Sequence, residues 1–323
     1  MPSGWRRKNE NGFMTIDSRI SGRRALVTGA SGFIGSALCR RLAQAGVEVH
    51  GVSRTKRTDT DYCARWHTCR FDDIDSVRAL VKTSRPDFIF HLASHVAGAR
   101  AVELVVPTFS GNLASTVNLL IAATELGCDR IFLTGSLEEP EPGPGHAIPS
   151  SPYAAAKFAA SAYGRMFHAL YKTPVVILRL FMVYGPGQQD LRKLVPYVIL
   201  SLLKGETPKL SSGVRKADWT YVDDVVAGYL AAAAAKGMEG DTIDLGTGRL
   251  ESVRTVVEEI FGLIDPQRKP DFGSMPERAL EQTRTANAEA SFRRLGWKAE
   301  VSLREGLSNT AEWYREQLRR GCL

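Results

Sequence analysis

Short apolar segments alternate with segments of helical spacing through the first half of the chain. The apolar segments have the length of buried strands and lie at Arg24–Thr28, Val47–Ser53, Thr68–Asp72, Phe88–Leu92, Arg130–Thr134 and Val175–Phe181. The segments with helical spacing lie between them, at Ile34–Ala45, Ser76–Thr83, Asn112–Glu125 and Tyr153–Tyr171. This alternation predicts an α/β fold built on a doubly wound parallel sheet.

The regular alternation of strand and helix patterns ends after Gly185, where proline, glycine and lysine separate shorter segments. We expect residues 21–182 to form the sheet domain, with residues 217–246 returning to it. Residues 183–216 and 247–323 then form a smaller α/β lobe that ends in helices at Asn287–Leu295 and Leu303–Arg319. The first 20 residues are polar and basic, and we expect them to form a flexible arm.

Composition narrows the class of protein. The 323 residues carry a net charge of +7, but the basic residues are dispersed and form no stripe of the kind that nucleic-acid binding needs. No apolar run approaches the ~20 residues that cross a bilayer, so we expect no membrane segment. The five cysteines are odd in number and include no C-x-x-C pair, which favours a reducing cytoplasm and argues against a metal site.

A glycine-rich turn joins the first expected strand to the first expected helix. Gly29 permits a tight turn, Gly32 permits close approach of a ligand, and Gly35 permits close packing of helix on strand. The free N–H groups at the start of the helix attract phosphate. The sequence therefore predicts a dinucleotide site, whose first group of contact residues is Gly29, Ser31, Gly32, Phe33, Ile34 and Gly35.

The end of the second expected strand indicates which dinucleotide binds. Enzymes that use NAD usually carry an acidic residue there. This chain has Ser53 and Arg54, followed by Lys56 and Arg57. Because an arginine can pair with a 2′-phosphate, the sequence favours NADP(H), with NAD as the alternative. A solvated basic loop is the other reading of these residues.

Two further segments complete the expected cofactor site. Asp72 and Asp73 follow the third expected strand, where a carboxylate and an N–H group can bind the adenine edge. The run H-L-A-S places Leu92, Ala93 and Ser94 along the cofactor path, while His91 is expected to be a packed histidine and no catalyst.

A tyrosine and a lysine stand four residues apart on one expected helix. Tyr153 and Lys157 therefore share a helix face, and a nearby ammonium favours ionisation of a phenol. Ser136 follows the fifth expected strand and can orient a substrate carbonyl. These three residues are the predicted catalytic set, and Tyr153 and Lys157 are also expected to contact the cofactor. A chance pair on a helix surface is the alternative.

Several motifs in order resemble the extended short-chain dehydrogenase/reductase superfamily. They are T-G-A-S-G-F-I-G, H-L-A-S, G-N-L-A-S-T-V-N-L-L, Y-A-A-A-K, R-L-F-M-V-Y-G-P-G-Q and W-T-Y-V-D-D-V-V. The resemblance covers Arg24 to Leu307 and implies a Rossmann-like domain with a lobe that binds a nucleotide sugar. It maps the family's Ser/Thr, Tyr and Lys onto Ser136, Tyr153 and Lys157, and implies a homodimer in which two helices of each chain pair.

Departures from the family pattern bear on the reaction. The 4,6-dehydratases carry an acid where this chain has Leu137, which disfavours dehydration, and the run G-S-L-E-E resembles that of 4-keto-6-deoxyhexose reductases. Met182 replaces an asparagine of many relatives, and Ala217 replaces an arginine, with Arg215 nearby. The candidate substrate contacts are Ser136, Glu138, Met182, Gln189, Lys193, Arg215 and Arg278.

The expected activity is NADPH-dependent reduction of a nucleoside-diphosphate (NDP) 4-keto-6-deoxy sugar at C4. One alternative is an NDP-sugar 4-epimerase with tightly bound NAD(P), which would use the same three residues. The other is a non-catalytic protein that binds NADP and regulates a partner; an intact Ser136, Tyr153 and Lys157 set argues against it.

Overall fold

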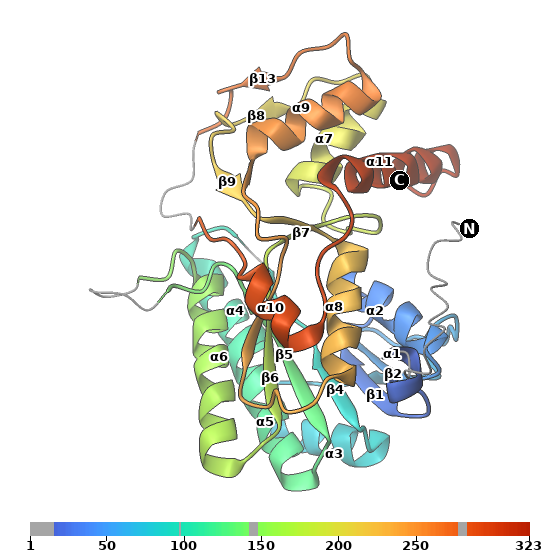
Figure 1. Ribbon diagram of the computed structural model, residues 1–323, viewed down its shortest axis with the longest axis vertical. Helices are drawn as coiled ribbons and strands as arrows, with labels where there is room; N and C mark the ends of the chain where they lie inside the picture. The colour runs from blue at the N-terminus through green and yellow to red at the C-terminus, as the bar shows by residue number, and fades with distance from the viewer. Residues whose placement is uncertain (1–15, 97, 142–147, 277–282) are drawn as a thin grey trace.

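A seven-stranded, wholly parallel sheet forms the centre of the protein (Figure 1). The computed structural model describes residues 16–96, 98–141, 148–276 and 283–323. The sheet has the order β11-β6-β5-β4-β1-β2-β3. Its strands are β1 (Arg24–Thr28), β2 (Glu48–Ser53), β3 (Arg65–Thr68), β4 (Phe88–His91), β5 (Arg130–Ser136), β6 (Val175–Leu180) and β11 (Thr242–Leu245). This order is that of a doubly wound Rossmann-like α/β fold, which confirms the predicted class.

Helices cover both faces of the sheet, as its mostly buried central strands require. On one face, α3 (Ile74–Ser84), α5 (Ser115–Leu126) and α6 (Pro152–Tyr171) enclose a core that includes Ile131 and Ile177. On the other, α2 (Phe33–Gln44) and α8 (Val222–Ala234) enclose a core that includes Phe132 and Leu178. Neighbouring residues of one strand thus enter opposite cores, because successive side chains alternate across a sheet.

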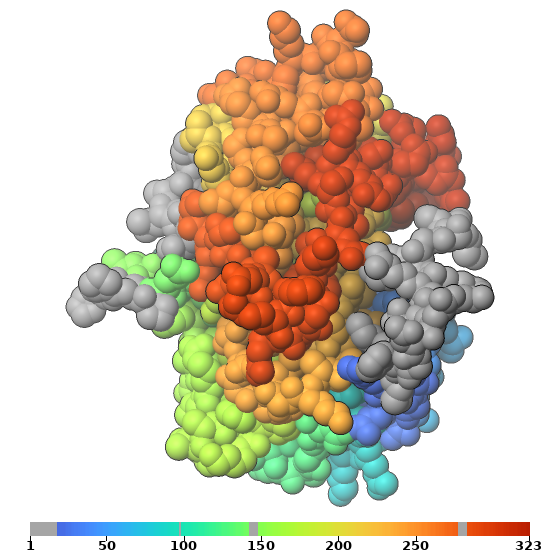
Figure 2. Space-filling view, viewed as in Figure 1, coloured from blue at the N-terminus to red at the C-terminus, as the bar shows by residue number. Residues whose placement is uncertain are grey.

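A smaller lobe lies beyond the carboxyl ends of the strands and appears at the top of Figure 1. Its helices α7 (Leu194–Leu203), α9 (Val253–Ile264) and α11 (Leu303–Arg319) share a separate apolar core. Three short strand pairs complete it or join it to the sheet domain: β7 (Met182–Tyr184) with β10 (Trp219–Tyr221), β8 (Lys209–Leu210) with β13 (Asp271–Phe272), and β9 (Lys216–Ala217) with β12 (Glu251–Ser252). In the space-filling view this lobe and the sheet domain are in broad contact (Figure 2).

Several elements differ from the sequence prediction, and β11 was not expected as a strand. The third strand ends at Thr68, so Asp72 and Asp73 lie in the turn that follows it. Residues 16–20 form a short helix, α1 (Ile16–Ile20), whose Ile20 is buried in the core, so this part of the expected arm is ordered. The helix α10 (Ala288–Leu295) packs on β11 and α8, although it was expected in the small lobe.

The helix expected from residue 112 begins ten residues earlier. It runs through η1 (Val102–Leu104), α4 (Val105–Thr108), a π-helical turn η2 (Phe109–Ala114) and α5. Among the described residues it is the one helix long and apolar enough to cross a membrane, and 33% of its apolar window is buried. This is weak evidence for a membrane segment, because the helix packs against α3 and α6.

Candidate functional site

The glycine-rich turn between β1 and α2 has the geometry of a phosphate cradle. Gly29 has a φ of +69°, and a side chain on it would lie 2.9 Å from the Ala93 nitrogen. A side chain on Gly35 would lie 2.1 Å from the Gly29 carbonyl oxygen. Gly32 caps α2 without a side-chain hydrogen bond, which leaves N–H groups at the start of α2 available to a ligand. These features fit a dinucleotide pyrophosphate.

Ser136, Tyr153 and Lys157 come together at the carboxyl end of β5. Ser136 ends that strand, while the N-terminal half of α6 carries the other two residues. The Ser136 hydroxyl accepts the Glu138 N–H at 3.2 Å and lies close enough to the Tyr153 phenol to lower its pKa. The Lys157 Nζ lies 5.9 Å from the Tyr153 ring centre. The helix start is fixed by Ser151, whose hydroxyl accepts a hydrogen bond from the Ala154 N–H at 3.1 Å.

Burial has the largest effect on the pKa values of Tyr153 and Lys157. It raises the pKa of Tyr153, against the effect of the Ser136 hydrogen bond, and the charges of Glu138 and Glu139 raise it further. It also lowers the pKa of Lys157 to about 8, which Glu139 opposes. Burial therefore outweighs the expected effect of Lys157 on Tyr153, and the pKa of the phenol stays raised. The Lys157 ammonium instead donates to the Thr134 carbonyl oxygen at 2.9 Å.

A buried polar chain connects the cofactor turn to the π-helical turn. His91 Nδ1 lies 2.8 Å from the Thr28 hydroxyl, and its Nε2 lies 3.1 Å from the Thr116 hydroxyl. Burial, followed by the charge of Lys157, lowers the pKa of His91 to about 3, so the ring is neutral. His91 is thus a packed histidine, as predicted. The Thr28 hydroxyl also accepts the Ala93 N–H at 3.0 Å and so positions the H-L-A-S segment.

Asn112 was not singled out from the sequence, although it stands in the quoted G-N-L-A-S run. It is buried in the π-helical turn, where its Oδ1 accepts the His95 N–H at 2.6 Å and the Ser94 hydroxyl at 3.0 Å. Its Nδ2 donates to the His95 carbonyl at 3.1 Å. Asn112 therefore fixes the segment that carries Ser94, beside the expected cofactor path.

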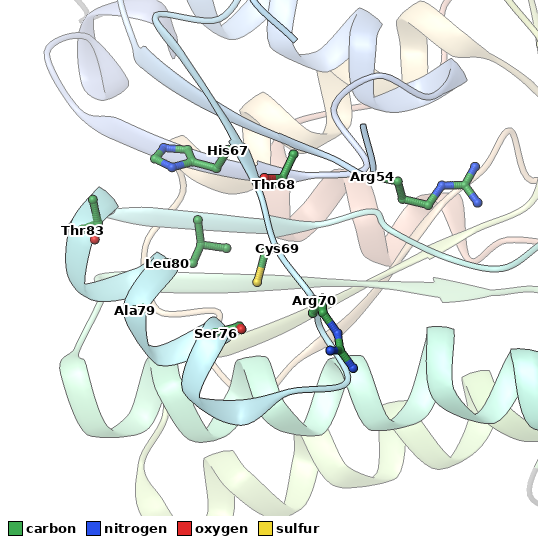
Figure 3. A pocket seen from close by; sticks show the side chains of 9 residues that line it. All are labelled: Arg54, His67, Thr68, Cys69, Arg70, Ser76, Ala79, Leu80 and Thr83. Carbon is green, nitrogen blue, oxygen red and sulfur yellow. The ribbon is translucent and has the colours of Figure 1, made fainter. Parts of the chain in front are cut away.

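The loop after β2 presents Arg54 to solvent at the mouth of a cavity of about 460 Å³. Figure 3 shows Arg54 and Arg70 at one end of this cavity, with Cys69 and Leu80 deeper between β3 and α3. No carboxylate pairs with Arg54 among the residues that the structure describes, whereas Arg57 is paired with Asp59. Ser53 is buried, and its hydroxyl donates to the Thr55 carbonyl. Arg54 and Lys56 are thus exposed cations of this loop, neither paired with a carboxylate among the described residues, and Arg54 directly follows the strand.

The two aspartates expected at the adenine have different partners. Asp73 is the N-cap of α3 and accepts the Asp75 and Ser76 N–H groups, both at 3.3 Å. Asp72 is exposed and pairs with Arg70 at 3.3 Å. Capping occupies the Asp73 carboxylate, so only Asp72 keeps a carboxylate open to solvent.

The candidate substrate residues are dispersed. Gln189 Nε2 donates to the Ser31 carbonyl at 2.6 Å, so Gln189 contacts the glycine-rich turn. Lys193 is exposed at the start of α7, and Met182 is half-buried in β7. Arg215 is half-buried beside β9, and Arg278 lies outside the described residues. Glu138 lies near the catalytic group, with its Oε2 3.5 Å from the Ser151 hydroxyl.

Comparisons with known proteins identify the family of the chain. The sequence profile of the NAD-dependent epimerase/dehydratase family matches residues 25–246. The chain is 32% identical over 319 residues to a UDP-glucose 4-epimerase of Mycolicibacterium smegmatis, which covers 91% of this chain and 99% of the relative.

Solved structures of nucleotide-sugar epimerases superpose on the chain. The chain superposes on a UDP-glucose 4-epimerase of Thermotoga maritima bound to UDP-glucose with a TM-score of 0.82 and 26% identity, over 91% of this chain and 99% of the other. It also superposes on the Thermus thermophilus UDP-glucose 4-epimerase in complex with NAD, with a TM-score of 0.79 and 26% identity, over 90% and 99%. The chain belongs to the NAD-dependent epimerase/dehydratase family and is an enzyme of the nucleotide-sugar epimerase and dehydratase type.

Proposed function

We propose that the chain catalyses NADPH-dependent reduction of an NDP-4-keto-6-deoxy sugar at C4. The observation that carries the redox chemistry is the group of Ser136, Tyr153 and Lys157 at the carboxyl end of β5, on the same edge of the sheet as the glycine-rich cradle after β1. The observation that favours reduction with NADPH is the open guanidinium of Arg54 at the position of the usual acid.

The roles of the residues follow from their protonation. A bound nicotinamide would supply hydride to C4. Tyr153 is protonated at neutral pH, because burial raises its pKa, and so it can give a proton to the oxygen on C4. Ser136 hydrogen-bonds the same oxygen, and Lys157 stabilises the tyrosinate that the proton transfer leaves behind. Gly29, Gly32 and the α2 N-terminus would hold the pyrophosphate.

Dehydration is disfavoured by the surroundings of Leu137. This side chain is 5% exposed and packs with Phe181 and Ala286 in an apolar cluster. A carboxylic acid placed there would lose its hydration without gaining a partner in that cluster. The chain therefore lacks an acid at the position that the dehydratases use, and it is proposed to consume a 4-keto sugar rather than to make one.

An NDP-sugar 4-epimerase is the second candidate. It is favoured by the UDP-glucose 4-epimerase relative, which is 32% identical over almost its whole length, and by a neighbour solved with NAD. Epimerisation would use the same three residues in both directions. The two candidates differ in the fate of the hydride, which an epimerase returns to the same carbon.

The deciding experiment follows nicotinamide absorbance and the sugar product together. With an NDP-4-keto-6-deoxyhexose and NADPH, we expect one NADPH to be oxidised for each sugar reduced, and we expect the purified protein to carry little nucleotide. Catalytic inversion of a 4-hydroxy NDP-sugar with no added cofactor and no net absorbance change would establish the epimerase instead.

Arg54→Ala should abolish the expected preference for NADPH over NADH. A charge-assisted hydrogen bond contributes about 1.5–3 kcal/mol, so the wild-type preference should be about tenfold or more. Titration of intrinsic fluorescence with each dinucleotide measures it. The control is Arg57→Ala, because Arg57 is already paired with Asp59 and its loss should leave the preference nearly unchanged. Equal wild-type affinity for NADPH and NADH would contradict the assignment of Arg54 to the 2′-phosphate.

We also propose a homodimer, formed through an exposed apolar face of the helices at residues 102–126 and 152–171. Val102 is 80% exposed, Val106 71%, Phe109 54% and Leu170 65%. Light scattering should give about twice the 35.4 kDa of one chain. Val106→Glu should shift the mass toward the monomer, whereas Val214→Glu, at a 68% exposed site in the small lobe, should not. A wild-type monomer at micromolar concentration would contradict this proposal.

A further inference from the structure

The carboxyl end of β5 extends beyond its neighbour β4. The β4 strand ends at His91, which pairs with Leu133, while β5 continues to Ser136. Two side chains bind backbone groups of this extension. The Lys157 ammonium donates to the Thr134 carbonyl at 2.9 Å, and the Ser136 N–H donates to Glu139 Oε1 at 2.7 Å. Lys157 and Glu139 therefore hold backbone groups only two residues apart in the same strand.

Glu139 is held firmly in this position. Its side chain is 3% exposed, and its own N–H donates to the Ser136 carbonyl at 3.1 Å, which closes a tight turn. A side chain on Gly135 would lie 2.8 Å from Glu139 Oε1, so the carboxylate fills the space that this glycine leaves. Arg284 Nη1 donates to the Glu139 carbonyl at 3.3 Å, while its Nε pairs with Glu141 at 3.0 Å.

We infer that Glu139 is a positioning residue, whose buried carboxylate fixes the Ser136 backbone and holds Lys157 in its ammonium form. This role deepens the proposed function, since it assumes that Lys157 serves the reaction. In a buried region of low dielectric, an electrostatic interaction between neighbouring groups is stronger than it is in water.

The sign of the effect follows from the surrounding charges. Burial lowers the pKa of Lys157 to about 8, and Glu139 raises it. The described ionisable groups near the site also include Tyr153, Glu138, neutral His91 and Tyr229, whose hydroxyl lies 2.7 Å from the Thr134 hydroxyl. Arg284, which interacts with Glu139, also interacts with Arg179, Glu141 and Asp244. Removal of the Glu139 charge should therefore lower the pKa of Lys157 further, so that Lys157 loses its proton at a lower pH.

Glu139→Gln is the direct test, because an amide oxygen can still accept the Ser136 N–H. We would titrate the protein labelled with [ε-¹³C]lysine by NMR without cofactor or sugar, and assign the Lys157 signal by its loss in Lys157→Met. The Lys157 midpoint should fall by about half a pH unit or more in Glu139→Gln. The matched control is Glu141→Gln, because Glu141 is 63% exposed and pairs with Arg284, which also binds the Glu139 carbonyl. The Lys157 midpoint in this variant should match that of the wild type.

An unchanged Lys157 midpoint in Glu139→Gln overturns the inference. If circular dichroism shows that Glu139→Gln is unfolded, Glu139→Asp replaces it. The Lys157 midpoint should then fall by less, because the carboxylate is withdrawn by one methylene. An unchanged Lys157 midpoint in Glu139→Asp also overturns the inference. With substrate, the alkaline limb of kcat/KM should move to lower pH in Glu139→Gln. Because the NMR titration needs no turnover, it remains decisive even if the proposed reaction is wrong.

Discussion

Tyr153→Phe should lower kcat about 10³-fold, within the range of about 10²–10⁴ that a positioned proton donor contributes. The phenol is the group that the structure places beside Ser136 in a buried environment, and phenylalanine keeps the ring while removing the proton. The measurement is NADPH oxidation with an NDP-4-keto-6-deoxyhexose, or sugar inversion if the protein proves to be an epimerase. The loss is expected in either reaction, because both need proton transfer at the oxygen on C4.

The control for this variant is Tyr163→Phe, on the same helix and 41% exposed. It should leave kcat unchanged, and both variants should unfold at the urea concentration of the wild type to within a small difference. If Tyr153→Phe keeps more than a tenth of wild-type kcat, Tyr153 is not the proton donor of the reaction. A wild-type protein that binds NADPH yet turns over no nucleotide sugar would favour the non-catalytic alternative.

The strands that the sequence located well are those buried on both faces. β1 matches its predicted bounds, and β4, β5 and β6 begin where predicted, because both of their faces require apolar residues. β3 and β11 are the exceptions, and they form the two edges of the sheet: β3 exposes Arg65 and Thr68, and β11 was not predicted as a strand. An edge strand needs no continuous apolar run, so its true position gave no signal that hydrophobic patterning could detect.

The site was predictable where its chemistry depends on residues close in sequence. Tyr153 and Lys157 share a helix face by spacing alone, and the glycine-rich turn is one continuous segment. The contacts that complete the site join distant or unremarkable residues: Asn112 with His95, and Gln189 with Ser31. Such contacts depend on how the π-helical turn and the small lobe pack, which local periodicity does not encode.

Gly35→Ala should destabilise the protein and weaken cofactor binding together. The added methyl group would lie 2.1 Å from the Gly29 oxygen and 2.8 Å from the Gly29 carbonyl carbon, so the turn and the start of α2 must move apart. Overpacking of this kind costs roughly 1–3 kcal/mol of unfolding free energy, measured by urea denaturation. Displacement of the α2 N-terminus should also lower dinucleotide affinity at least about tenfold, measured by fluorescence titration.

Gly262→Ala separates this steric effect from the general effect of replacing a helical glycine. Gly262 lies in α9 and is exposed, and a side chain there would meet no atom within 4 Å. Because alanine is favoured over glycine in a helix by up to ~1 kcal/mol, this variant should be at least as stable as the wild type and should bind cofactor normally. If Gly35→Ala behaves like Gly262→Ala, the close packing of α2 on the turn is not required, and the cradle would have to hold the pyrophosphate through Gly29 and Gly32 alone.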